Sequence, residues 1–278
     1  MHTYVVVDAF SRHSLSGNPV AVFFGSDDLT ADQMQRIARE MNLSETTFVL
    51  RPRTGGDAHV RIFTPVNELP FAGHPLLGTA VALAGRTGAD RLDLETARGV
   101  IAFELEKAGQ RTFRARMRQP VPTWGPFDRT DELLQALGID ASTLPVEVYT
   151  NGPRHVLVGV ESVAALSALD PDHRALSRFR DVACNCIAGQ GSAWRNRMFS
   201  PAYGVVEDAA TGSAAGPVAI HLARHGLHPY GRPLDIVQGV EIGRTSHMEA
   251  LVHGQGDRVE SVEVTGHAVV SAEGVLHV

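Results

Sequence analysis

The feature that most constrains this chain is a sequence unit that occurs twice. Each copy runs in the same order, from an aromatic–hydroxyl–proline triplet through an acidic residue to a glycine, a polar residue and an apolar stretch, as in Phe63-Thr-Pro65, Glu68, Gly73, His74 and in Phe199-Ser-Pro201, Asp208, Gly212, Ser213. The copies lie about 140 residues apart, which indicates an internal duplication. We therefore expect two similar half-domains.

Each unit is expected to place the start of a helix at its glycine. Gly212 permits a tight turn and close approach to a ligand, Ser213 is suited to cap the helix, and Pro75 suits a first helical turn. Free N–H groups and the positive end of the helix dipole bind anions at such a start. If the two starts face each other, the cleft between them can hold a small carboxylate.

The predicted boundary between the halves is the proline- and glycine-rich segment that begins at Gln119. This gives an N-terminal half of residues 1–118 and a C-terminal half of 119–264, with the return of residues 265–278 to the first half left open. Strand patterns dominate both halves. The other local expectations are a capping box at Thr30 to Gln33, a helix capped by Thr130, helices at 162–169 and 171–179, and separate strands at 259–264 and 268–278.

Composition excludes several classes of function. Of the 278 residues, 44% are hydrophobic and 20% are charged, as expected of a globular protein with an ordinary core. The net charge is −6 and no basic run occurs, which argues against nucleic acid as a partner. The apolar run after Met1 is too short for a signal peptide or a membrane span. With only two cysteines, we expect a reducing, cytoplasmic location and no disulfide framework.

Glu45 is the first candidate for chemistry. It alternates with Leu43, Thr47 and Val49 on one face of a predicted strand, and a carboxylate on such a face marks either a solvated edge or a functional site. On position alone the solvated edge is the commoner outcome. In a partly apolar cleft, the pKa of Glu45 would rise and the carboxylate would become a better base.

Three further candidates lie in the repeated unit. His74 could exchange a hydrogen bond with a substrate, Asp208 could orient an amine or hydroxyl, and Ser213 could bind a carboxylate. Their alternatives are a surface histidine, a solvated loop acid and a plain helix cap.

The remaining patterns favour neither a metal nor a cofactor. Cys184 and Cys186 are interpreted as small buried residues. His221 and His225 are four apart, but no spaced carboxylate supports them, so we interpret them as surface or helix-end residues. The stretch Gly73 to Gly78 lacks the lysine of a phosphate loop. We expect no cofactor and no metal.

The ordered motifs together resemble the PhzF family, the phenazine-biosynthesis isomerases of the diaminopimelate-epimerase-like superfamily. The motifs are Gly17-Asn-Pro-Val, Asn42-Leu-Ser-Glu45-Thr-Thr-Phe, Phe63-Thr-Pro, Gly73-His74-Pro, Asn151-Gly-Pro-Arg-His, Phe199-Ser-Pro and Asp208-Ala-Ala-Thr-Gly-Ser213. They extend to about residue 226 and so cover most of the chain.

The resemblance implies an α/β (α+β) fold of two pseudo-symmetric half-domains, each a curved, mostly antiparallel sheet around a central helix. It implies a homodimer and a cofactor-independent isomerisation of trans-2,3-dihydro-3-hydroxyanthranilate to an aminoketone that condenses toward phenazines. The family's proton-shuttling glutamate falls on Glu45, and its histidine, aspartate and serine fall on His74, Asp208 and Ser213. Gly73 and Gly212 would bind the substrate carboxylate.

Two other functions stay open. The first is an epimerase of another amino acid, although amino-acid epimerases of the superfamily carry cysteines at the two helix starts, where this chain has His74 and Ser213. The second is a non-catalytic protein that binds an aromatic carboxylate, which would not need Glu45 on an apolar face.

Overall fold

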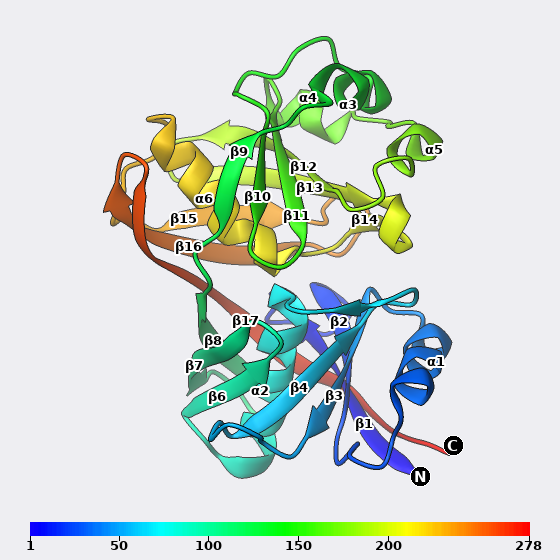
Figure 1. Cartoon of the computed structure of the whole chain (residues 1–278). Helices are drawn as coiled ribbons and strands as arrows, with labels where there is room; N and C mark the ends of the chain where they lie inside the picture. The colour runs from blue at the N-terminus through cyan, green and yellow to red at the C-terminus, as the bar shows by residue number, and fades with distance from the viewer.

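Two lobes stacked on each other form the molecule (Figure 1). The computed structural model describes residues 1–278. The first lobe contains β1 (His2–Ala9), β2 (Asn18–Phe23), α1 (Ala31–Met41), β3 (Glu45–Leu50), β4 (Ala58–Phe63), β5 (Glu68–Leu69), α2 (Gly73–Thr87), β6 (Arg91–Thr96), β7 (Gly99–Lys107) and β8 (Thr112–Gln119).

The second lobe repeats this plan. It contains β9 (Thr123–Pro126), α3 (Thr130–Leu137), β10 (Glu147–Thr150), β11 (Arg154–Gly159), α4 (Val163–Ser167), α5 (His173–Leu176), β12 (Ala183–Gln190), β13 (Ala193–Ser200), a 3-10 turn (Pro201–Tyr203), β14 (Val205–Asp208), α6 (Gly212–Arg224), β15 (Leu234–Gln238) and β16 (Ser246–Gln255). A last strand, β17 (Arg258–Leu276), belongs to both lobes.

Strand pairing in the two lobes is equivalent, element by element. In the first lobe β2 and β3 are parallel, β3 and β4 antiparallel, and β4 and β6 parallel. In the second lobe β11 and β12 are parallel, β12 and β13 antiparallel, and β13 and β15 parallel. Most other pairs are antiparallel, which confirms the predicted fold of two pseudo-symmetric halves.

Each lobe is wrapped around one central helix, α2 or α6. Apart from His74, neither helix carries an acidic or basic side chain in its first two turns, so each is apolar on nearly every side and must be buried. Residues 73–82 of α2 and 212–222 of α6 are indeed all buried. Leu76 and Leu77 of α2 belong to the same continuous core as Val218 and Ile220 of α6. None of the helices has the length and apolarity to cross a membrane.

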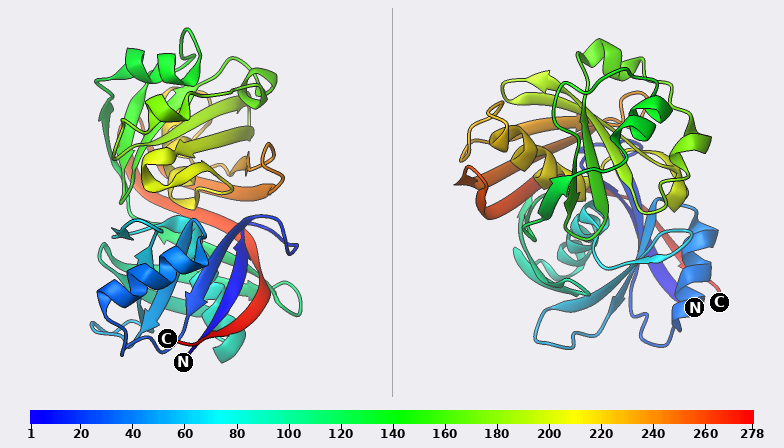
Figure 2. Two further views of the ribbon diagram at one scale, coloured as in Figure 1. Left: turned by 90° about the vertical axis from the view of Figure 1, so that its right-hand side faces the viewer. Right: turned by 45° about the horizontal axis from the view of Figure 1, so that its top comes forward.

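The strand β17 joins the two lobes. Its start pairs with β16, its middle with β8 and its end with β1. It passes from the upper to the lower lobe and ends beside the N-terminus (Figures 1 and 2). The two separate strands predicted at 259–264 and 268–278 are therefore one strand, because the chain stays extended while it changes partners.

Local expectations were correct where the relevant bonds are short-range. Thr30 and Gln33 form the capping box of α1, and Asn42 ends that helix in the left-handed conformation. The cap assigned to Thr130 is wrong, because Thr130 is the first residue of α3 and its hydroxyl donates to the Phe127 carbonyl.

The predicted helices at 162–169 and 171–179 are also too long. Only α4 and α5, of five and four residues, form there. The predicted connection after Gln119 contains β9, which pairs with β10. The half-domain boundary at residue 118 stays a prediction.

The starts of α2 and α6 meet at the junction between the lobes. A Cβ on Gly73 would lie 2.3 Å from the Ser213 nitrogen and 2.4 Å from the Gly212 carbonyl carbon. Two backbones can approach this closely only where a side chain is missing.

We predict that Gly73→Ala lowers the free energy of unfolding by about 1–3 kcal/mol, because the new methyl group overpacks two backbones. Urea unfolding followed by circular dichroism measures this loss. Gly85→Ala is the matched control on the same helix, since its Cβ would meet only Phe113 Cε2 at 3.9 Å. The control should be neutral or stabilising by up to about 1 kcal/mol. Equal stability of the two variants would contradict a packing role for Gly73.

Candidate active site

A pocket between the lobes contains most of the predicted residues. Its lining includes Glu45, Gly73, His74, Asp208 and Ser213. Gly212 lies just behind this lining, where a Cβ would be 2.7 Å from Phe10 Cε2 and 2.9 Å from the His74 nitrogen. The structure thus brings all six candidates to one place, from elements far apart in the sequence.

Both helix starts open onto this pocket without a side-chain cap. The residue before α2 is Ala72, and the residue before α6 is Thr211; neither side chain accepts a hydrogen bond from its helix. The Ser213 cap is therefore a wrong prediction, because Ser213 lies inside the first turn. Its hydroxyl makes no hydrogen bond within the protein and is free for a ligand. Two uncapped helix starts in one pocket offer unpaired N–H groups that an anion could accept from.

Glu45 and His74 are in contact in this pocket. Glu45 is the first residue of β3, and its Oε2 lies 3.2 Å from His74 Nε2. Although this distance is short enough for a hydrogen bond, the groups are not aligned for one, and both atoms are buried without a hydrogen-bond partner. The Glu45 side chain is only 14% exposed, so the alternative of a solvated edge is wrong. Its Oε2 is left free to exchange a proton with a bound molecule.

Asn18, at the start of β2, fixes the tautomer of His74. Its side-chain Nδ2 donates to Asp208 Oδ1 at 2.7 Å and to the Ala210 carbonyl at 2.9 Å, and these two acceptors set the orientation of the amide. The same nitrogen lies 3.2 Å from His74 Nδ1. Because an amide nitrogen can only donate, a proton on His74 Nδ1 would have no acceptor there, and the ring proton is assigned to Nε2, the nitrogen beside Glu45. Sequence reasoning missed this role, although Asn18 lies in the Gly17-Asn-Pro motif.

Asp208 is held by hydroxyl and amide donors. Thr211 Oγ1 donates to its Oδ2 at 2.8 Å, and Ser44 Oγ lies 3.3 Å from its Oδ1. Gln238 Nε2 in turn donates to Thr211 Oγ1 and to the Asp208 carbonyl, at 2.9 Å each. Thr211 lies in the Asp208 to Ser213 motif, but its role was missed. Gln238 had no distinctive sequence signal, because its role depends on contacts that only the fold creates.

Burial sets the protonation of the three titratable groups. It lowers the pKa of His74 to about 3, so the imidazole is neutral. It raises the pKa of Asp208 to about 6, against hydrogen bonds from Thr211, Asn18 and Ser44 that favour the carboxylate. Burial and the negative charge of Asp208 together raise the pKa of Glu45 well above its ordinary value. The site thus combines a neutral donor, an anchored carboxylate and a carboxyl of raised basicity, which suits it to proton transfer.

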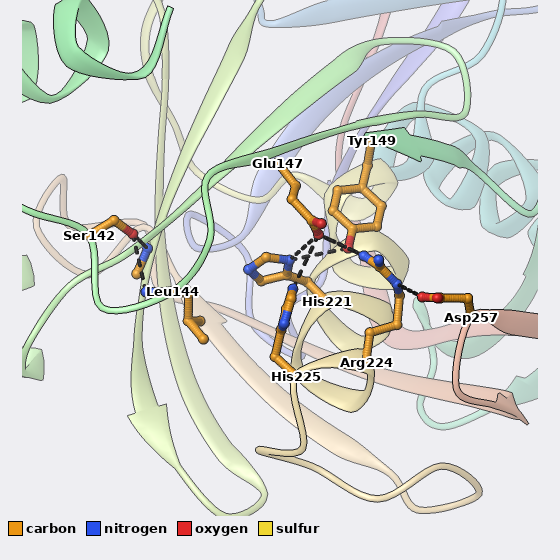
Figure 3. A network of polar contacts seen from close by, with 9 residues as sticks. Ser142, Leu144, Glu147, Tyr149, His221, Arg224, His225 and Asp257 are labelled. Carbon is orange, nitrogen blue, oxygen red and sulfur yellow. Dashed lines mark hydrogen bonds and ion pairs between the residues drawn. The ribbon is translucent and has the colours of Figure 1, made fainter. Parts of the chain in front are cut away.

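A second polar cluster lies away from the pocket, at the far end of α6. The two histidines interpreted as surface or helix-end residues are within reach of a carboxylate here, since Glu147 Oε2 is 3.1 Å from His221 Nδ1 and 3.3 Å from His225 Nε2 (Figure 3). Both lie at the end of α6, as the second alternative has it, but His221 is fully buried and is no surface residue. Strand β10 supplies the carboxylate, a pairing that the sequence spacing could not indicate.

Arg224 already supplies the positive charge in this cluster. Its Nη1 lies 2.6 Å from Glu147 Oε2 and 2.7 Å from the Tyr149 hydroxyl, and its Nε lies 2.7 Å from Asp257 Oδ1 (Figure 3). A metal ion on the three ligand atoms would have to share this carboxylate oxygen with a guanidinium. We therefore assign the cluster a structural role, which is to fasten α6 to β10.

The chain was compared with known proteins. A family model for the phenazine biosynthesis-like (PhzC-PhzF) proteins matches residues 7–274. The trans-2,3-dihydro-3-hydroxyanthranilate isomerase of Pseudomonas aeruginosa is 65% identical over 274 residues, which cover 99% of each chain.

Solved structures are similar over the whole length. A predicted epimerase from Pseudomonas aeruginosa superimposes with a TM-score of 0.87 and 32% identity, over 100% of both chains. A hydroxyproline epimerase from Agrobacterium vitis has a TM-score of 0.68 and 13% identity, over 98% of this chain and 90% of that one. This second likeness shows a common fold alone.

We predict that Glu147→Gln lowers the free energy of unfolding by about 1–3 kcal/mol at pH 7, because Arg224 loses a charged acceptor. Burial would raise the pKa of Glu147, but hydrogen bonds from Arg224, Tyr149 and His225 outweigh it and hold the pKa at about 2. A lowered carboxyl pKa stabilises the fold above the unfolded value of about 4.5, and this contribution is lost as pH falls toward 2.

The difference in free energy of unfolding between wild type and Glu147→Gln should therefore shrink as pH falls from about 4.5 toward 2. Urea unfolding at several pH values measures it. Glu132→Gln removes an exposed carboxylate that also pairs with an arginine, and it should change stability by less than about 0.5 kcal/mol. A Glu147→Gln variant as stable as this control would contradict the structural role.

We also predict that Glu45→Gln raises the melting temperature, and raises it more at pH 8 than at pH 5. A carboxyl whose pKa is raised by folding destabilises the fold as pH rises through the folded pKa, and a neutral amide does not. Each kcal/mol gained should add about 2–4 °C, read by scanning calorimetry. Glu68→Gln, at an exposed glutamate of β5, serves as control. A lower melting temperature of Glu45→Gln at pH 8 would show that the carboxylate is not strained in the folded protein.

Proposed function

The chain belongs to the phenazine biosynthesis-like (PhzC-PhzF) family, and we propose that its pocket isomerises trans-2,3-dihydro-3-hydroxyanthranilate to an aminoketone that condenses toward phenazines. The observation that carries the proposal is a buried carboxyl of raised basicity, Glu45, beside a neutral imidazole and between two uncapped helix starts. The 65% identity to an isomerase of this name supports the choice of substrate. The reaction proposed needs no cofactor.

The substrate carboxylate is placed at the two helix starts. Gly73 and Gly212 offer backbone N–H groups there, and Ser213 adds a free hydroxyl. His74 and Asp208 then face the amino and hydroxyl groups, because both lie beside Glu45 on the same wall. This arrangement leaves the ring against the carboxyl group that moves the proton.

Glu45 acts as a proton shuttle in the proposed reaction. Its carboxylate removes the proton from the ring carbon that bears the hydroxyl, and the electron pair moves through the diene toward the carbon that bears the carboxylate. Glu45 returns the proton to that second carbon, which leaves an enol that tautomerises to the ketone. The His74 Nε2–H, facing Glu45, supports the carboxylate form while the proton is absent.

The other functions considered are less well supported. An amino-acid epimerase with two thiols would need cysteines at the helix starts, whereas Cys184 and Cys186 lie buried on β12. A non-catalytic binding protein would gain nothing from Glu45, since a buried carboxyl of raised pKa lowers stability at neutral pH.

The wider setting is also proposed. We infer half-domains of residues 1–118 and 119–264, a homodimer, and a location in the cytoplasm. The half-domains follow from the repeated unit, and the homodimer follows from the family resemblance. The location in the cytoplasm fits the two free cysteines.

We predict that Glu45→Gln lowers turnover by at least ~10²–10⁴-fold, the usual contribution of one acid–base residue. Binding of an aromatic analogue should be retained, because the amide fills the same space. Proton NMR of the purified protein with the dihydro substrate in D₂O measures turnover, and partial retention of the substrate proton at the new carbon indicates one shuttling group.

Glu68→Gln is the control, because this exposed glutamate pairs with Arg61 outside the pocket. It should turn over substrate like wild type. An active Glu45→Gln enzyme would refute the shuttle. A wild type that binds the substrate without turnover would favour the binding protein.

A further inference from the structure

The lining of the pocket contains a histidine that the proposed mechanism does not use. His155 lies on β11, is fully buried and lines the pocket. Its Nε2 is buried without a hydrogen-bond partner. A buried polar atom without a partner destabilises a protein by about 1–3 kcal/mol, so its presence in a ligand pocket calls for a functional reason.

The other ring nitrogen of His155 is held by a chain of amides. Asn185 Nδ2 donates to the Ala183 carbonyl at 2.9 Å and lies 3.4 Å from His155 Nδ1. The orientation of Asn185 is fixed from its other end, because its Oδ1 accepts from Asn196 Nδ2 at 3.1 Å.

The chain continues through Gln238 to the site already described. Asn196 Nδ2 also donates to Gln238 Oε1 at 2.9 Å. Gln238 Nε2 donates to the Asp208 carbonyl, which a flipped amide could not do. Each amide therefore has one possible orientation, and the chain ends with an N–H directed at His155 Nδ1. The proton of His155 must be on Nε2.

His155 thus offers an uncharged N–H to the pocket. Burial lowers the pKa of His155 to about 3, so the ring stays neutral at working pH. The substrate carboxylate is already assigned to the two helix starts, so this donor is available to another oxygen of the substrate.

The duplication explains where His155 lies relative to Glu45. Glu45 pairs with Val20 across the parallel strands β2 and β3. At the equivalent place in the second lobe, Ala183 pairs with His155 across β11 and β12. The functional side chain is therefore on the second strand in one lobe and on the first strand in the other. The small Ala183 leaves space in front of His155.

We infer that His155 is a substrate-binding residue whose Nε2–H donates to the oxygen on the ring carbon that bears the hydroxyl. The inference rests on the proposed function. The carboxylate is assigned to the helix starts, and the amino and hydroxyl groups face His74 and Asp208. The hydroxyl oxygen has two lone pairs and can therefore accept a further hydrogen bond from His155. That oxygen becomes an enol and then a carbonyl oxygen, and a fixed donor stabilises it throughout.

Three aromatic ligands test this contact by calorimetric titration. 3-Hydroxyanthranilate carries the amine, hydroxyl and carboxylate, anthranilate lacks the hydroxyl, and 2-aminophenol lacks the carboxylate. In His155→Leu the dissociation constants for 3-hydroxyanthranilate and 2-aminophenol should rise about tenfold, the effect of one lost hydrogen bond. The constant for anthranilate should stay within about twofold. His155→Gln, which keeps an N–H donor, should recover part of the loss.

The control is His221→Leu, which removes another buried histidine whose Nε2 has no partner but which lies outside the pocket. It should leave all three affinities unchanged. Equal weakening of all three ligands by His155→Leu, or none, would overturn the inference. Weakening of the two carboxylate ligands alone would place the contact at the carboxylate and overturn it too. If the hydroxyl-specific loss appears in a protein that does not turn over substrate, the contact stands and the proposed reaction fails.

Discussion

The contact between the starts of α2 and α6 is the constraint on which the rest of the structure depends. Gly73 meets the backbone of Gly212 and Ser213 at distances that exclude any side chain. Because the two helices touch there, their uncapped N–H groups open into one pocket. The sheet of the first lobe then brings Glu45 to that pocket, and the sheet of the second lobe brings His155. A single close approach thus converts two repeated lobes into one asymmetric site.

The buried titratable groups of the site destabilise the folded protein. Two carboxyl groups and two neutral histidines are buried together, and burial moves the pKa of each away from its ordinary value. Amide side chains stabilise the arrangement without adding charge, since Asn18 connects groups from both lobes and Gln238 connects groups within the second lobe. Ion pairs that fasten the periphery, such as Arg224 with Glu147, lie on the outer ends of the same elements. The ion pairs that stabilise the fold therefore lie away from the pocket, where the buried titratable groups destabilise it.

Much of this arrangement can be predicted from the sequence, and the roles that were missed in the site have a common cause. The duplication, the helix starts and the misfit of Glu45 on its strand are visible in the sequence, and they indicated six residues that the structure places together. The role of Asn18 depends on Asp208, a partner more than a hundred residues away in the sequence. Thr211 precedes α6 without capping it, and its role depends on contacts with Asp208 and Gln238. The pairing of His221 with Glu147 likewise joins residues 74 apart. Local spacing carries no information on such contacts, whereas the fold supplies them directly.

The final strand has a consequence for how the chain is made. Residues 268–276 of β17 pair with β1, so one edge of the first lobe is closed by residues that are synthesised after the second lobe. Until then the edge of β1 that does not pair with β2 has no partner, although the helix and the other strands of this lobe were synthesised long before. The first lobe therefore cannot complete its sheet before β17 is synthesised, and the two lobes reach their final structure together rather than in order of synthesis. Contacts of such long sequence separation slow folding, and the unpaired edge is exposed to other chains during that interval.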